Sequence, residues 1–143
     1  MERKAFLRSL GAGAAFALTF PCLQGCSSDS DSGNGEEVPT GVDFTIDLSG
    51  PDGNDLQENG DFIIRNDVVV ARNLEGNFVA ASRICSHQQN PGVSFIQEQG
   101  GIFECYVHGS QFSQNGTPLN SVTQNPLKVF RTSLEGELLR IYE

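Results

Sequence analysis

The stretch from Ile84 to Phe112, ICSHQQNPGVSFIQEQGGIFECYVHGSQF, contains two matched pairs of cysteine and histidine. Cys85 and His87 form a Cys-x-His pair, Cys105 and His108 form a Cys-x-x-His pair, and 17 residues separate them. Thiolates and imidazoles are ligands for zinc and for iron. Because each short pair can point its side chains from one loop, the two pairs together predict a single metal centre.

The sequence around these pairs favours β-strands. Apolar and polar side chains alternate in residues 42–48, as in a strand with one buried face, and short apolar runs follow between turns. The predicted strands cover residues 42–48, 62–65, 68–72 and 77–83, a hairpin at 93–105 around Gly100-Gly101, and a hairpin at 127–143 around Glu135-Gly136. No window keeps a helical period, so an all-β sandwich or small barrel is predicted, with both ligand pairs in loops after strands.

The two pairs and the residues after them resemble the Rieske iron-sulfur motif, Cys-x-His followed by Cys-x-x-His-Gly-Ser-x-Phe. The resemblance covers approximately residues 41–142 and implies a Rieske-type fold, with antiparallel sheets and two cluster-binding loops at one tip. It also implies a 2Fe-2S cluster, in which Cys85 and Cys105 bind one iron and His87 and His108 bind the redox-active iron. Ser110 matches the serine that hydrogen-bonds to a bridging sulfide in this family.

Three positions depart from the respiratory branch of the family. Asn90 and Val107 stand where respiratory members have two further cysteines that form a disulfide, and Phe112 stands where they have a hydrogen-bonding tyrosine. Residues 121–123, Ser-Val-Thr, replace a Gly-Pro-Ala loop that often covers the cluster. Neutral imidazole ligands raise the potential of Rieske centres to roughly −150 to +300 mV. Because fewer hydrogen bonds to sulfur stabilise the reduced cluster less, we predict a potential below that of respiratory Rieske proteins.

The first 40 residues are interpreted as an export and anchoring region. Basic residues precede an apolar run from Leu10 to Phe20, so residues 1–25 are predicted to be a signal peptide. Leu23 to Cys26, LQGC, resembles a bacterial lipobox, which implies lipidation of Cys26. Glu2 to Leu7 resembles a twin-arginine signal with Lys4 at the second arginine, and general secretion stays an alternative. Residues 26–40, rich in Ser, Asp and Gly, are predicted to be a flexible acidic tether to a domain at 41–143.

The charge of the chain bears on its partners. It has 9 Lys and Arg against 18 Asp and Glu, so it repels phosphate backbones, and nucleic acid is excluded as a partner. An acidic surface attracts a basic protein, although it also keeps an ordinary protein soluble. The predicted partners are therefore a redox protein, either a cytochrome or an oxidoreductase, and a membrane reached through the lipid anchor.

The sequence predicts one-electron transfer outside the cytoplasm, by a lipid-anchored carrier or a small subunit of a periplasmic oxidoreductase. The anchor places it on the periplasmic face or on the outer membrane, and no independent substrate site is apparent. One alternative is the Rieske subunit of a quinol-oxidising cytochrome bc-type complex. Another is a structural lipoprotein that binds zinc or no metal, and a Cys85–Cys105 disulfide is also open.

Overall fold

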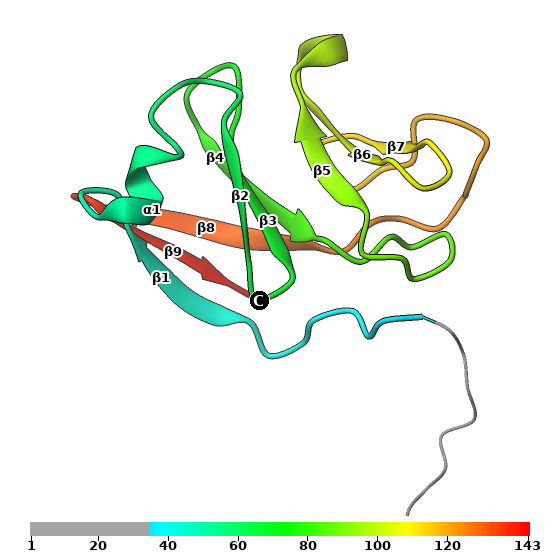
Figure 1. The fold of residues 1–143 in the computed structure, drawn as a ribbon, viewed down its shortest axis with the longest axis horizontal. Coiled ribbons are helices and arrows are strands. Elements are labelled where there is room, and N and C mark those ends of the chain that lie inside the picture. The colour runs from blue at the N-terminus through cyan, green and yellow to red at the C-terminus, as the bar shows by residue number, and fades with distance from the viewer. Residues whose placement is uncertain (1–34) are drawn as a thin grey trace, which may run out of the picture. The chain divides into compact units, whose positions relative to one another are not determined.

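The computed structural model describes residues 35–143, which fold into antiparallel β-sheets (Figure 1). The predicted signal peptide and Cys26 lie outside the described residues. The strands are β1 (Asp43–Asp47), β2 (Phe62–Arg65), β3 (Val68–Arg72), β4 (Phe78–Ser82), β5 (Val93–Ile96), β6 (Ile102–Cys105), β7 (Ser110–Phe112), β8 (Val129–Glu135) and β9 (Leu138–Tyr142). The all-β prediction is thus confirmed.

The strands form two sheets. One has the order β1-β9-β8-β4-β3-β2, and the other has the order β5-β6-β7. The helical elements are short: α1 (Pro51–Asn54) lies between the predicted strands at 42–48 and 62–65, and the 3-10 helix η1 (Glu98–Gly100) lies at the predicted Gly100-Gly101 turn. No helix in residues 35–143 is long and apolar enough to cross a membrane.

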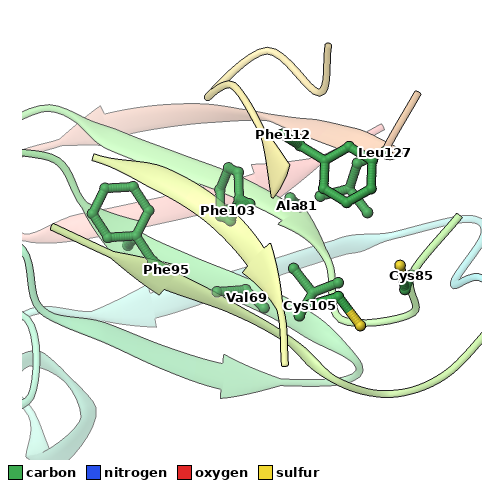
Figure 2. Close-up of a cluster of buried hydrophobic side chains, with 10 residues drawn as sticks. Val69, Ala81, Cys85, Phe95, Phe103, Cys105, Phe112 and Leu127 are labelled. Carbon is green, nitrogen blue, oxygen red and sulfur yellow. The ribbon is translucent and has the colours of Figure 1, made fainter. Parts of the chain in front are cut away.

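Strand β3 is buried on both faces and separates two cores. Val68 and Val70 pack with side chains from β1, β8 and β9. Val69 and Ala71 point the opposite way, into a core shared with the three-stranded sheet (Figure 2). Because alternate residues of a strand face opposite sides, this arrangement explains the uninterrupted apolar run of β3. The core in Figure 2 also contains both described cysteines, so the second sheet carries the candidate ligands on a packed base.

Two local features were not predicted from the sequence. The first is the strand β7, in which Phe112 pairs with Phe103 and Ser110 pairs with Cys105 of β6. The second is the conformation of the two residues between the predicted strands at 62–65 and 68–72, where Asn66 and Asp67 have φ of 51° and 58°. Positive φ at both central residues is typical of a hairpin turn matched to strand twist, and Asn and Asp tolerate it better than most residues.

Replacing Gly116 by alanine is expected to lower the free energy of unfolding by more than about 3 kcal/mol. Gly116 has φ 86°, and an added Cβ would lie 2.2 Å from the backbone oxygen of Leu127. Gly100 is the matched control, since its φ is 85° and no heavy atom lies within 4 Å of an added Cβ. Gly100→Ala should therefore lose only about 1 to 2 kcal/mol. Urea unfolding of both variants measures the difference, and equal losses would contradict this account.

Three carboxylates at the β1–β9 edge predict an acid-sensitive stability. Hydrogen bonds from Arg140 to Asp43, from Ser49 to Asp47 and from Lys128 to Glu143 lower the pKa of each carboxyl. A pKa that is lower in the folded state stabilises folding above the unfolded pKa, and the gain is lost as pH falls through the folded value. Stability should therefore decrease below about pH 4.

The Asp43–Arg140 pair allows a direct test of this acid sensitivity. Arg140 Nε and Nη2 donate to the two carboxylate oxygens of Asp43 at 2.8 and 2.6 Å. Asp43→Asn should make the melting temperature less dependent on pH in the acid range, and Arg140→Gln should have a similar effect. The stabilisation that this ion pair contributes will be small, because both side chains are exposed to solvent. A wild-type melting temperature that stays constant down to about pH 3 would refute the prediction.

Candidate metal centre

The two ligand pairs lie in the two loops that border the second sheet. Cys85 and His87 follow β4 in the loop that leads to β5, and Cys105 ends β6, with His108 in the loop before β7. Figure 2 shows Cys85 and Cys105 at the same end of the buried cluster. The structure thus places the two predicted cysteine ligands at one end of the second sheet.

The sulfur pair is buried and free of disulfide bonds. Cys85 and Cys105 are 1% and 0% exposed, and both are free thiols. Burial raises the pKa of Cys105, the nearby Cys85 raises it further, and the backbone N–H groups of Val107 and His108 act in the opposite direction. A deprotonated sulfur at this position therefore needs a positive charge beside it, which a metal ion supplies.

The histidine pair lies at the same site with the rings edge to face. The ring centroids of His87 and His108 are 4.9 Å apart, and the ring planes are inclined by 85°. His87 is half-buried and His108 is exposed. His87 Nδ1 is buried and has no hydrogen-bond partner within residues 35–143. Since buried polar atoms almost always have partners, this nitrogen is well placed to be a ligand.

Ser110 adds a second buried polar atom without a partner. Ser110 is fully buried, and its Oγ has no hydrogen-bond partner in the part of the chain that the structure describes. Ser110 pairs directly with Cys105 across β6 and β7, so the two side chains point to the same face of the sheet. A hydroxyl donor beside a ligand sulfur suits a cluster sulfide, and the site residues therefore fit a 2Fe-2S cluster.

Backbone hydrogen bonds shape both ligand loops. In the first loop, Gln89 N–H donates to Cys85 O, and Cys85 N–H donates to Asn90 O, both at 2.9 Å. In the second loop, Gly109 N–H donates to Cys105 O at 2.9 Å, and Gly109 has φ 73°. Each loop thus folds back onto its own cysteine, so that cysteine and histidine are presented from one tight turn.

Gly92 allows the two loops to approach closely. Tyr106 N–H of the second loop donates to Gly92 O at 3.1 Å. An added Cβ on Gly92 would lie 2.8 Å from Val107 Cγ2 and 3.1 Å from Cys105 Sγ, which is closer than normal contacts. The sequence predicted no role for Gly92, because the partners that exclude a side chain come from the other loop.

Part of the predicted tether contacts the first ligand loop. Glu36 N–H donates to Gln89 O at 2.9 Å, and Lys128 Nζ donates to Pro39 O at 2.9 Å. Residues 35–40 therefore lie against the domain, with Glu36 at the first ligand loop. A single sequence gives no signal for these contacts, since the acceptor in each is a backbone carbonyl.

The assignment of Cys85, His87, Cys105 and His108 as ligands remains a prediction. The positions of the two cysteine–histidine pairs support it. Across residues 35–143, no three His, Cys, Asp or Glu side chains surround a single point as the ligands of one metal ion would. The side chains instead approach each other in two pairs: Cys85 lies beside Cys105, and the ring of His87 lies beside the ring of His108.

The family model of the Rieske [2Fe-2S] domain matches residues 34–131, and the chain belongs to this family. The domain of this family binds a 2Fe-2S cluster, so the predicted cofactor is confirmed. Rieske proteins transfer electrons to redox partners or oxygenase subunits. The protein is therefore an electron-transfer protein of the Rieske class.

Solved structures show the same fold. The ferredoxin of carbazole 1,9a-dioxygenase from Nocardioides aromaticivorans IC177 matches with a TM-score of 0.52 and 21% identity, over 62% of this chain and 89% of that chain. Dicamba monooxygenase matches with a TM-score of 0.55 and 18% identity, over 71% of this chain and 34% of its own. The chain thus spans about a third of that oxygenase. The comparison with curated proteins found no match.

Proposed function

We propose that this Rieske protein is an extracytoplasmic carrier of single electrons, held at a membrane by a lipid on Cys26, or a small subunit of a periplasmic oxidoreductase. The observation that carries the redox site is the pairing of two buried free thiols with two adjacent imidazoles. When bound at this site, a 2Fe-2S cluster accepts and releases one electron.

The residues around the site divide into a buried side and an exposed side. Cys85, Cys105 and Ser110 are fully or almost fully buried, so they hold one side of the site away from water. His108 is exposed, and Tyr106 beside it is 76% exposed. A partner that docks at the exposed side would come closest to the imidazole of His108, which supports electron entry and exit there.

A low-temperature electron paramagnetic resonance spectrum of the dithionite-reduced protein tests this function. We expect the rhombic signal with a low average g value that a His-ligated 2Fe-2S cluster gives, together with iron and acid-labile sulfide in equal amounts. Reconstitution with iron and sulfide before the measurement controls for poor loading in the expression host. A reconstituted protein that contains zinc, or no metal, would overturn the proposal in favour of a structural lipoprotein.

The lipid anchor rests on the sequence alone, through the lipobox resemblance of Leu23 to Cys26 and the polar residues that follow. Metabolic labelling with a radioactive fatty acid should give a labelled band at the size of the mature chain. Copurification from detergent-solubilised membranes would identify the partner. Recovery of a cytochrome b would favour the quinol-oxidising complex over the carrier.

Electron exchange at this tip is expected to depend weakly on salt. Residues 84–127 contain two carboxylates, Glu98 and Glu104, and no Lys, Arg or Asp. Glu36, whose backbone N–H donates to Gln89 O, adds a carboxylate beside the first loop. Salt screens distant charges, so the charges close to the tip dominate. The rate constant for oxidation of the reduced protein by an anionic or a cationic metal complex should therefore change no more than about twofold between about 0.1 and 1 M salt.

A charged variant of the tip serves as the control for this salt experiment. Val107 is 40% exposed beside His108, so Val107→Lys adds a cation to a stretch, residues 84–127, that has no Lys or Arg. This variant should speed the reaction with the anionic complex, and salt should then slow it. If the wild type itself varies tenfold with salt, or if Val107→Lys behaves like the wild type, the prediction is wrong.

A further inference from the structure

The segment from Leu119 to Pro126, here called the bridging segment, hydrogen-bonds to both ligand loops. Asn120 Nδ2 donates to Gly109 O in the second loop at 2.7 Å. Ser86 Oγ in the first loop donates to Asn125 O at 2.7 Å, and Asn125 Nδ2 approaches Ser86 O at 3.5 Å in return. One segment thus holds two loops that are far apart in the sequence.

The contacted residues lie directly beside candidate ligands. Ser86 stands between Cys85 and His87, and Gly109 stands between His108 and Ser110. Each contacted residue is thus joined to a candidate histidine ligand by a single peptide bond, so a shift of that residue also shifts the ligand. The bridging segment thus contacts the residue next to each histidine.

The bridging segment has internal hydrogen bonds that stiffen it. Within the segment, Asn120 Oδ1 accepts from Val122 N–H, and it also accepts from Gln111 N–H of β7, both at 3.4 Å. Thr123 is 7% exposed, and its Oγ1 accepts from Asn125 N–H at 3.1 Å. Asn120 and Asn125 are thereby fixed at the two ends of one compact turn. A rigid connection of this kind can transmit a fixed spacing, which a flexible loop cannot.

The loops also contact each other directly, at Gly92 and at the two histidine rings. The two cysteines of the described residues are free and lie at ligand positions, and a direct hydrogen bond between the loops runs from Tyr106 N–H to Gly92 O at 3.1 Å. We propose that Asn120, Asn125 and Ser86 are positioning residues that clamp the two ligand loops together by hydrogen bonds, an inference that rests on the proposed redox site. The clamp fixes how far apart His87 and His108 are held.

Hydrogen exchange of the mature chain, as purified, tests the clamp without any assay of electron transfer. Ser86→Ala removes the donor to Asn125, and Asn120→Ala removes the donor to Gly109. Each change should speed amide exchange in residues 84–92 and 105–110 by about two- to tenfold, the range expected for one net hydrogen bond. Exchange in β3 should not change, because the backbone of that strand pairs with β2 and β4.

Two matched variants separate the clamp from general effects of substitution. Ser86→Thr keeps the hydroxyl and should restore slow exchange. Ser113→Ala removes a serine hydroxyl that bonds to Asn115 and accepts from Thr117 N–H, in a turn outside the clamp. This control should leave both ligand loops unchanged.

Cluster retention gives the second readout. In the loaded protein, Ser86→Ala and Asn120→Ala should lose visible absorbance about two- to tenfold faster in the presence of a chelator. Their electron paramagnetic resonance lines should broaden, because the ligands then sample a wider range of positions. Ser86→Thr should reverse both changes, and a role limited to overall stability would alter the rate of loss without broadening the lines.

The clamp is refuted if exchange in both ligand loops is the same in Ser86→Ala, Asn120→Ala and wild type, or if Ser86→Thr behaves like Ser86→Ala. A protein that never binds a cluster would refute the proposed function. The exchange experiment would still decide the clamp in that case, since it needs only the folded chain. If a single variant does not fold, circular dichroism will reveal it, and the other variant then carries the test alone.

Discussion

His108→Ala is expected to purify with almost no iron or acid-labile sulfide and with no visible absorbance, although it folds normally. His108 is exposed, so its loss leaves both cores intact and should change the free energy of unfolding of the cluster-free chain by less than about 0.5 kcal/mol. Loss of a ligand, in contrast, leaves one iron incompletely coordinated, and the cluster should not persist. Iron and sulfide analysis per chain gives the measurement.

Cys105→Ser should lose the cluster as completely, and it needs a control for packing because Cys105 is fully buried. Val93 pairs directly with Cys105 across β5 and β6 and belongs to the same core. Val93→Ala should lose about 1 to 3 kcal/mol of stability and still bind the cluster. Iron retained in Cys105→Ser or His108→Ala would show that the ligand assignment is wrong. Iron lost from Val93→Ala would show that the assay reports packing.

The parts of the fold that followed from the sequence are those with local causes. The strands β2 and β3 were predicted at the residues where they occur, because β-branched runs bounded by turn residues favour strands. The ligand pairs were recognised because their spacing along the chain is short and specific. In both cases the information lies within a few consecutive residues.

The parts that did not follow have partners far away in the sequence. Strand β7 is three residues long and exists through its pairing with β6, so no periodicity within it could reveal it. The contact of Ser86 with Asn125 joins residues 39 positions apart. Gly92 is required by a side chain and a sulfur of the other loop. Such features depend on which loops contact each other in the folded chain. The spacing of residues along a single sequence does not reveal those contacts.

The closeness of residues 35–40 to the first ligand loop gives the anchor a structural consequence. Glu36 is bonded to Gln89, and the predicted lipid on Cys26 lies ten residues before Glu36 in the chain. Ten extended residues reach at most about 36 Å. If the anchor exists as proposed, the redox tip therefore works within a few nanometres of the membrane surface, where a membrane-bound partner would meet it.

Cys26→Ser is expected to move the protein from the membrane fraction to the soluble fraction of the cell envelope. A lipidated cysteine inserts several acyl chains, each worth about 0.8 kcal/mol per buried CH₂, so the wild type should stay with membranes through carbonate washing. Without acyl chains, the acidic segment that follows has no affinity for anionic lipid surfaces. Fractionation followed by immunoblotting measures the change, which should involve nearly all of the protein.

Cys22→Ser is the matched control, since it changes the other leader cysteine and leaves LQGC intact. This variant should remain in the membrane fraction, and mass spectrometry should find acyl chains on Cys26. An N-terminal anchor that is never cut would behave differently, because Cys26→Ser would then stay in membranes with residues 1–25 still attached. An ordinary signal peptide would leave the wild type soluble. Each outcome selects one of the three ways in which the first 26 residues can direct the redox domain to its place of work.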